Sequence, residues 1–146
     1  MGKLADLLRR GLEAGDRGDL DTVMAMADPE VELIDPTLPA PARGKAEVRA
    51  ALEQIRRAFP DERVTVRHVI EGDGWIAAEV TFTGTNLGPL RGPQGEAPAT
   101  GKRVTIEACH VMQTAGDKIL RYRIYLDTMS VLAQLGLIPA AATSGR

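Results

Sequence analysis

The chain has 146 residues, a formal net charge of −2 and a pI of about 5.7, and 44% of its residues are hydrophobic. This composition is typical of a soluble globular protein, and the lack of a basic excess argues against nucleic-acid and anionic-membrane partners. One cysteine permits no intrachain disulfide, and two distant histidines argue against a metal site. No apolar run is long enough to span a membrane, so we expect one cytoplasmic domain over residues 1–139 and a frayed tail over 140–146.

Two amphipathic helices are predicted at the N-terminus. The first covers residues 3–14, where leucines recur at helical spacing. Asp19 can act as an N-cap and start the second helix, which is expected to end at Asp28-Pro29 because the residue before a proline disfavours helical backbone. The apolar stripe of this second helix is Leu20, Val23, Met24 and Ala27.

The next segment combines a strand, a proline-rich loop and the most regular helix of the chain. Residues 31–35 alternate between apolar and polar and predict a short strand. Three prolines in residues 36–41 exclude a helix or a central strand and predict an ordered loop or a lid. The helix covers residues 44–59, and Pro60 ends it. Its apolar face is Val48, Leu52, Ile55 and Phe59.

Strands dominate the second half of the chain. Residues 64–70 and 75–83 predict two strands joined by a turn at Gly72-Asp73-Gly74. The glycines and prolines of residues 84–100 predict a long loop, and loops of this length are more often functional than decorative. Apolar residues between 129 and 135 predict a short final helix.

The strongest local signal is a β-hairpin over residues 101–127. Two apolar, β-branched runs flank Ala115-Gly116-Asp117-Lys118, which has turn chemistry. Because side chains alternate along a strand, His110 shares one face of the first strand with apolar residues. Tyr122, Ile124 and Leu126 share one face of the second strand. A histidine on an otherwise apolar strand face is the sharpest chemical feature of the sequence.

The order of these elements predicts an α+β fold. Helices gathered before a run of strands favour a curved, mostly antiparallel sheet wrapped around the N-terminal helices as an α+β barrel or cone. A sheet wrapped around a helix leaves a hollow. We therefore expect an apolar cavity that binds a small molecule.

Seven short segments, none specific alone, occur together in an order and spacing that carry a family resemblance. They are Ile34-Asp35-Pro36, the 44–60 helix ending in A-F-P, T-G-T-N-L-G-P-L at 83–90, T-G-K-R-V at 100–104, H-V-M at 110–112, Asp127, and L-A-Q-L-G at 132–136. From Leu4 to about Pro139 the chain resembles the SnoaL-like polyketide cyclases. The resemblance implies the cone fold shared with nuclear-transport-factor-two-like domains and ketosteroid isomerases, and a homodimer.

The same resemblance implies a chemistry. SnoaL-like cyclases close a ring by an intramolecular aldol reaction without metal or organic cofactor, using an aspartate on the last strand and a histidine on the strand before it. The resemblance puts His110 at the histidine position and Ile124 at the aspartate position. Limonene epoxide hydrolase, of the same fold, has an arginine and a second aspartate where this chain has Val80 and Phe82, so its triad is absent here.

Three residues are the candidates for catalysis. His110 titrates near neutrality and can take and return a proton, although a buried histidine can also serve packing alone. Asp35 could act as a base whose pKa is raised by burial, could orient His110, or could simply close an Asx-turn before Pro36. Tyr122 could donate a hydrogen bond to a developing oxyanion, or be an aromatic core residue.

Substrate contacts are expected from residues of inward parity and from the cavity mouth. The set is Leu33, Val80, Phe82, Asn86, Met112, Ile124, Leu126 and Asp127. Asp127 could instead cap the final helix. The outward-facing residues Glu79, Thr81, Glu107 and Cys109 are expected to form a solvated face or a homodimer interface, and His68 to lie at the surface or in an interface.

The expected function is that of a cofactor-independent enzyme that closes or isomerises a ring in a polyketide-like or other polycyclic apolar small molecule. Two alternatives stay open. The first is a non-catalytic module of the same fold that binds a small hydrophobic ligand or forms a dimer. Ile124 at the usual aspartate position favours this alternative. The second is an epoxide-opening hydrolase or cyclase that uses the carboxylate of Asp35.

Overall fold

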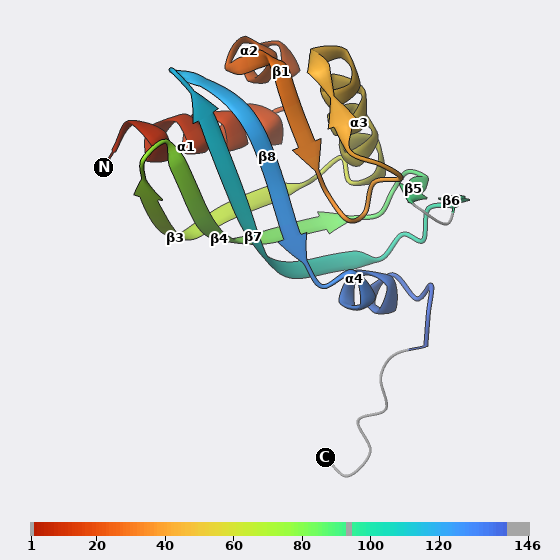
Figure 1. The fold of residues 1–146 in the computed structure, drawn as a ribbon. Coiled ribbons are helices and arrows are strands. Elements are labelled where there is room, and N and C mark those ends of the chain that lie inside the picture. The colour runs from red at the N-terminus through yellow and green to blue at the C-terminus, as the bar shows by residue number, and fades with distance from the viewer. Residues whose placement is uncertain (1, 93–94, 140–146) are drawn as a thin grey trace.

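The computed structural model describes residues 2–92 and 95–139, so the tail expected over 140–146 lies outside the described residues. In these ranges the chain forms four helices and eight strands (Figure 1). The helices are α1 (Lys3–Asp16), α2 (Leu20–Ala25), α3 (Gly44–Ala58) and α4 (Thr128–Gln134). The strands are β1 (Ala27–Ile34), β2 (Ala42–Arg43), β3 (Arg63–Gly72), β4 (Trp75–Thr85), β5 (Leu90–Gly92), β6 (Gly95–Ala97), β7 (Arg103–Ala115) and β8 (Lys118–Leu126).

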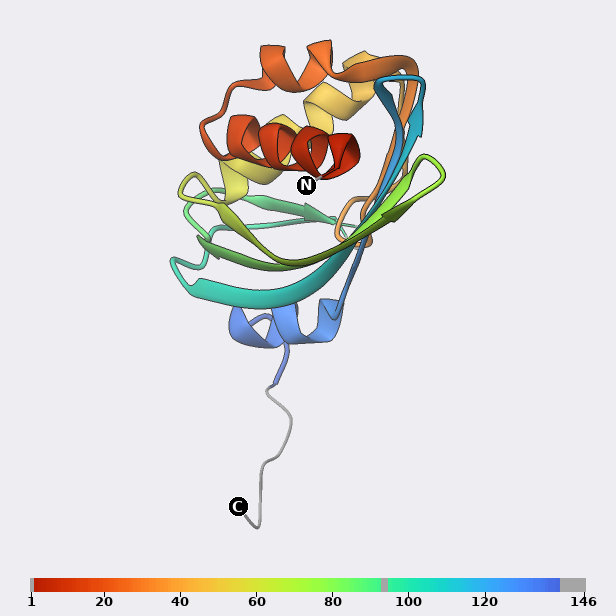
Figure 2. The ribbon, with the colours of Figure 1, turned by 90° about the vertical axis from the view of Figure 1, so that its left-hand side faces the viewer.

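Six strands form one sheet in the order β2-β1-β8-β7-β4-β3. Each neighbouring pair is antiparallel except β1 and β8, which are parallel. The sheet is strongly curved, with α1, α2 and α3 on its concave side and α4 on the opposite side (Figure 2). This arrangement confirms the predicted α+β fold with a curved, mostly antiparallel sheet.

The hairpin of β7 and β8 forms as predicted. Gly116 takes a positive φ of 61° in its turn, a conformation that glycine adopts without steric cost. The register places His110 opposite Ile124 and Met112 opposite Tyr122. The inward face of β7 is therefore the apolar face that the alternation of the sequence indicates.

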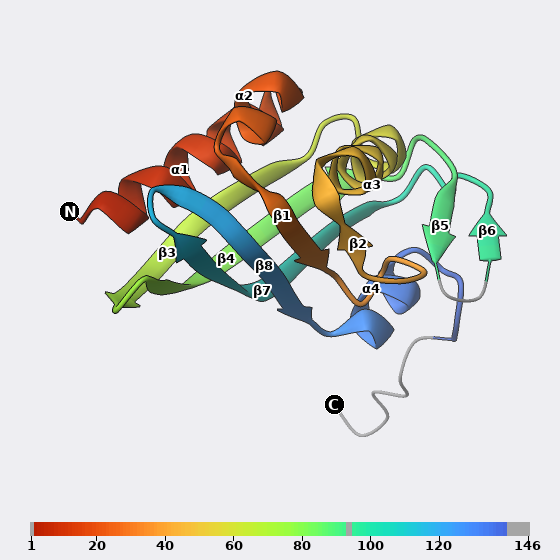
Figure 3. The same cartoon turned by 45° about the horizontal axis from the view of Figure 1, so that its top comes forward.

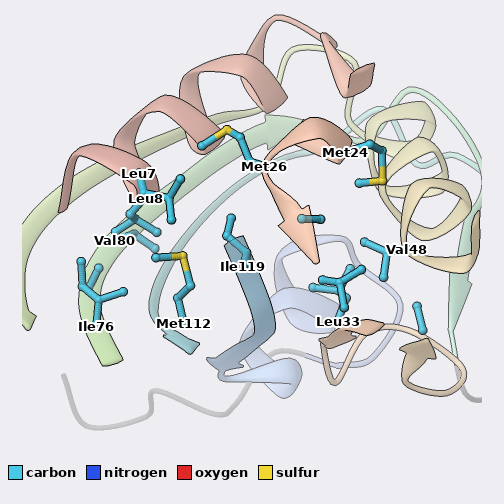
Figure 4. Packing of buried hydrophobic residues seen from close by; sticks show 14 of the residues in the cluster. Leu7, Leu8, Met24, Met26, Leu33, Val48, Ile76, Val80, Met112 and Ile119 are labelled. Carbon is cyan, nitrogen blue, oxygen red and sulfur yellow. The ribbon is translucent and has the colours of Figure 1, made fainter. Parts of the chain in front are cut away.

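The core fills one end of the concave face. The inner side of α1 packs on β3 and β4, as the helical spacing of its leucines requires. Leu7 and Leu8 of α1 lie over Ile76, Val80 and Met112 of the sheet (Figure 4). These five side chains are buried and belong to one core cluster.

Two of the predicted boundaries are wrong. The second helix ends at Ala25, and Asp28-Pro29 lies inside β1 instead of stopping the helix. Pairing of β1 with β8 shifts register between Ala27 and Glu32, and such an irregularity accommodates a proline, which has no N–H to donate. The segment predicted as one long loop contains the end of β4 and the small β5–β6 hairpin, which lies beside α3 (Figure 3).

Candidate functional site

An apolar cavity of about 210 Å³ lies between the concave face of the sheet and helices α1, α2 and α3. Residues from the inner faces of these helices and from β1, β3, β4, β7 and β8 line it. Of the predicted lining residues, Leu33, Phe82, Ile124 and Leu126 belong to the wall. The three candidate catalytic residues, His110, Asp35 and Tyr122, line it too.

His110 and Tyr122 form a hydrogen-bonded pair inside this cavity. Nδ1 of His110 and the hydroxyl oxygen of Tyr122 are 2.6 Å apart, and the two rings meet edge to face at 5.2 Å. The pair is diagonal across β7 and β8, because the residue directly opposite His110 is Ile124. The hydrogen bond orients the imidazole, which is 6% exposed.

Burial keeps both partners of this pair neutral at pH 7. It lowers the pKa of His110 to about 4, and it raises the pKa of Tyr122 far above its usual value. When the tyrosine hydroxyl donates to Nδ1, Nε2 of His110 carries the proton and can donate it. When Nδ1 donates to the tyrosine oxygen, Nε2 has a free lone pair and can accept a proton. The pair can therefore relay a proton in either direction.

Asp35 both closes a turn and faces the cavity. Its Oδ1 accepts hydrogen bonds from the backbone N–H of Thr37 at 2.8 Å and from the Thr37 hydroxyl at 2.7 Å, which is an Asx-turn. Burial raises the pKa of Asp35, and the two bonds from Thr37 only partly oppose this rise. In the described part of the chain Asp35 makes no hydrogen bond to His110, so the partner that orients the imidazole is Tyr122.

Asp35 and His110 lie on opposite sides of Ile124. Asp35 follows Ile34, whose neighbour on β8 is Arg123, and this register brings Asp35 beside Ile124. His110 is the partner of Ile124 on the other side. β1, which leads into Asp35, and β7, which carries His110, are two strand spacings apart in the sheet, or roughly 10 Å. A bound molecule can therefore meet a carboxylate at one atom and the His110–Tyr122 pair at another.

Three charged residues that the sequence analysis does not single out line the cavity where α1 and α3 end. Nη1 of Arg56 donates to the carbonyl oxygens of Gly15 at 3.1 Å and Asp16 at 3.0 Å. The carboxylate of Asp16 accepts the backbone N–H of Val64 at 3.3 Å. Burial raises the pKa of Asp16, and burial together with the Asp16 charge raises the pKa of Glu62 to about 7.

The sequence does contain a signal for these residues. Asp16 lies four residues after Leu12 on α1, and Arg56 lies four residues after Leu52, within the stripe that Phe59 ends. Glu62 lies two residues before Val64 and so has the inward parity of β3. A pattern defined by its apolar members alone assigns charged residues at the same spacing to solvent. Counting every residue at the inward spacing, charged residues included, finds all three.

Val80 and Met112 have the predicted inward parity but do not belong to the cavity wall among the described residues. Both side chains are fully buried under Leu7 and Leu8 of α1 (Figure 4). Parity states which face of the sheet a residue occupies, and the position of α1 then decides that these two belong to the core.

Asn86 and Asp127 are structural, and neither belongs to the described cavity wall. Asn86 is fully buried, and its side-chain amide donates to the carbonyls of Ala58 at 3.3 Å and Gly88 at 2.8 Å. Its Oδ1 accepts the N–H and hydroxyl of Thr100. Asp127 caps α4 through Ser130, whose backbone N–H lies 3.1 Å from Oδ1, as the alternative interpretation predicts.

The convex face of the sheet carries a polar network. Thr81 accepts a hydrogen bond from Arg67 at 3.0 Å and donates one to Glu107 at 3.0 Å. His68 lies at the surface as predicted, 2.9 Å from the carboxylate of Glu79. Cys109 is a partly exposed free thiol.

Residues 2–92 and 95–139 contain no group of three or more His, Cys, Asp or Glu side chains that could hold a metal ion. No helix within the same ranges is both long and apolar enough to cross a membrane.

Comparison with known proteins decides the family. The family model for SnoaL-like polyketide cyclases matches residues 5–135, which is most of the chain. The chain belongs to the SnoaL-like polyketide cyclase family. This SnoaL-like protein is 30% identical over 137 residues to aklanonic acid methyl ester cyclase DnrD of Streptomyces peucetius, and the match covers 90% of this chain and 89% of DnrD.

Solved structures confirm the fold of this SnoaL-like protein. A protein from Jannaschia sp. CCS1 that is assigned to the SnoaL-like polyketide cyclases superposes with a TM-score of 0.82 at 18% identity, covering 94% of each chain. A protein with a ketosteroid-isomerase-like fold from Catenulispora acidiphila superposes with a TM-score of 0.75 at 16% identity, covering 94% of this chain and 96% of the other. At these identities the likeness concerns the fold alone.

Proposed function

We propose that this SnoaL-like protein catalyses the acid/base-assisted ring closure or isomerisation of a polyketide-like or other polycyclic small molecule without a cofactor. The observation that carries the proposal is the neutral His110–Tyr122 pair in an apolar cavity with Asp35 across Ile124. Family membership supports the reaction class, since the relative DnrD is named as a cyclase.

Asp35 is the proposed base. Its Oδ1 accepts both bonds from Thr37, which leaves Oδ2 without a partner among the described residues. Burial raises the pKa of Asp35, which makes its carboxylate a stronger base than one in water. It would remove a proton from a carbon next to a carbonyl group and form an enolate. The enolate carbon then attacks a second carbonyl carbon of the same molecule, so a carbon–carbon bond forms and that carbonyl oxygen becomes an alkoxide.

His110 and Tyr122 are the proposed stabilisers of this alkoxide. Neutral donors in a cavity with few competing waters stabilise a developing negative charge strongly. The pair passes a proton to the alkoxide and regains one from solvent, while Asp35 releases its proton to solvent. The product is then an isomer of the substrate, and no oxidant or reductant takes part. Apolar walls such as Leu33 and Phe82 would fold the substrate so that its reacting carbons meet.

Conservative substitutions at the site test this proposal. Aklanonic acid methyl ester, the substrate in the name of the relatives, is the first probe, with the isomeric product followed by chromatography and mass spectrometry. We expect Asp35→Asn to lower turnover by about 100-fold, because loss of a general base typically has this effect. Asp28→Asn is the matched control, since Asp28 also accepts a backbone N–H two residues on, at 2.8 Å, but is not part of the described cavity wall.

His110→Gln and Tyr122→Phe test the proton relay independently of the base Asp35. Both are expected to lower turnover while substrate binding changes little, because the apolar wall is kept. Unchanged turnover in Asp35→Asn and His110→Gln would contradict the proposed roles.

A non-catalytic binding module is the second candidate function. Ile124 favours it, because an apolar residue faces His110 where the resemblance places the acid/base aspartate. Binding of aromatic polyketides by the wild type without turnover of any cyclisable one would support this alternative over the enzyme.

A further inference from the structure

Glu62 is an acidic group on the cavity wall that the proposed reaction does not use. It lines the cavity at the end where α1 and α3 terminate. Among the described residues the carboxyl group of Glu62 forms no hydrogen bond and no ion pair. The Arg63 guanidinium donates to the backbone carbonyls of Glu62 and Asp16 and not to the Glu62 side chain. Burial and the Asp16 charge raise its pKa to about 7, so near neutral pH much of Glu62 carries a proton that it can donate.

The backbone holds this carboxyl group in a defined position. Glu62 closes a turn after α3, in which its N–H donates to the carbonyl of Phe59 at 3.0 Å. Pro60 occupies the second position of that turn, where its fixed φ is favourable. β3 begins directly afterwards at Arg63. An unpartnered acid on a short, tied turn is better placed to meet a ligand than one on a mobile loop.

Glu62 is far from the His110–Tyr122 pair along the sheet. Arg63 pairs with Thr83 of β4, whereas His110 pairs with Ala78 of the same strand. Thr83 and Ala78 are five residues apart (83 − 78), which is about 17 Å of strand. The wall between the two ends is largely apolar and includes the edge-to-face pair Phe59–Phe82.

We propose that Glu62, as a neutral carboxylic acid, donates a hydrogen bond to an oxygen at the far end of the bound molecule, so that the ligand is an elongated apolar molecule with oxygens at both ends. This proposal rests on the proposed function, since it specifies the substrate class of the same cavity. The oxygen near His110 belongs to the reacting centre, and the oxygen near Glu62 fixes how deeply and in which direction the molecule enters.

The charges around Glu62 explain why an acid is suited to this task. Asp16 at the end of α1 repels its ionised form. Arg56 of α3 favours that form, but its guanidinium already bonds the backbone carbonyls at the end of α1. Burial raises the pKa of Asp16, and the positive charge of Arg63 on β3 opposes this rise and so helps to keep the Asp16 carboxylate ionised. A carbonyl oxygen of a ligand offers the protonated carboxyl group the acceptor that the protein does not.

Two synthetic ligands test the proposal by direct binding. The probes are 2,6-diacetylnaphthalene, which has a carbonyl at each end, and 2-acetyl-6-ethylnaphthalene, which has one. At pH 6 we expect the wild type to bind the diketone about tenfold more tightly, the effect of one additional buried hydrogen bond. Glu62→Leu should abolish this preference and keep the affinity for the monoketone, which also shows that the variant is folded. Glu62→Gln, whose amide can donate a hydrogen bond, should keep most of the preference for the diketone.

The pH dependence distinguishes a donated proton from simple packing. Between about pH 6 and pH 8 the wild type should lose its preference for the diketone as Glu62 ionises, whereas Glu62→Gln should not. Glu53→Gln, the same change at an exposed position of α3, is the matched control and should behave as the wild type. Equal affinity of the wild type for both ligands, no measurable affinity for either, or an unchanged preference in Glu62→Leu overturns the proposal. A Glu62-dependent preference without turnover of any cyclisable substrate overturns only the proposed reaction.

Discussion

At the scale of single residues, one physical cause acts on the cavity's titratable groups in opposite directions. Burial disfavours the charged form, so it lowers the pKa of His110 and raises the pKa of Asp35 and Glu62. His110 is consequently neutral at pH 7, and Glu62 carries a proton far more often than a glutamate in water. The apolar wall thus provides both a neutral imidazole and a neutral acid at the same pH.

The free energy of unfolding should depend on pH because His110 is buried. Below its ordinary pKa of 6.5 the unfolded chain protonates His110, whereas the folded chain does so only near pH 4. The free energy of unfolding therefore falls as the pH drops from 6.5 to 4, by on the order of 3 kcal/mol. His110→Gln should lack this loss in urea unfolding measured across the pH range. Asp35 and Glu62 are present in both proteins, so their contributions cancel when the wild type is compared with His110→Gln. Parallel pH profiles of the two proteins would contradict the lowered pKa of His110.

At the scale of elements, the segment T-N-L-G explains how the end of β4 is joined to α3. Backbone N–H groups of Leu87 and Gly88 donate to the carbonyl of Ala58 at the end of α3. A Cβ at Gly88 would collide with the backbone carbonyl of Arg57, so only glycine permits this approach. The side chain of Asn86 then ties α3 to Thr100, which precedes β7.

Removal of the Asn86 side chain should therefore destabilise the whole fold. Asn86→Ala leaves the Gly88 carbonyl and the Thr100 donors without their partner and removes one of three bonds to the Ala58 carbonyl, which costs about 3 kcal/mol in the free energy of unfolding. Asn86→Asp should not rescue it, because the oxygen that replaces Nδ2 faces two carbonyl oxygens. Chemical denaturation measures both variants. A loss below about 0.5 kcal/mol in Asn86→Ala would show that the network is not needed.

At the scale of the whole molecule, the convex face of the sheet remains the predicted contact with a second copy. Its residues Glu79, Thr81, Glu107 and Cys109 lie on the side away from the cavity, and the Arg67–Thr81–Glu107 network orders the side chains of Thr81 and Glu107. A homodimer through this face would leave the cavity of each subunit complete, because helices and sheet of one chain enclose it.

Sedimentation velocity tests the dimer. We expect the wild type to sediment as a dimer, and Cys109→Arg to shift it toward monomer by placing a charge in the centre of the face. Ala50→Arg on the exposed side of α3 is the matched control and should stay dimeric. A wild type that remains monomeric at high concentration rules out the homodimer.

Most of the fold follows from local patterns in the sequence. Helical spacing locates α1 and α3, and the hairpin turn with its alternation locates β7, β8 and the inward side chains of His110, Tyr122 and Ile124. Boundaries near proline and glycine are less well determined. Pro29 can end a helix or sit in a strand irregularity, and only pairing with β8 selects the second.

The sequence by itself determined which face of each element turns inward, because side-chain direction follows from backbone geometry. Only the tertiary structure decided what covers that face. It put α1 over Val80 and Met112, which belong to the core, and left Ile124 and Phe82 uncovered on the cavity wall. It also brought the ends of α1 and α3 to the start of β3, where Asp16, Arg56 and Glu62 meet. Periodicity is a local property, whereas contacts between elements depend on how the curved sheet closes around the helices.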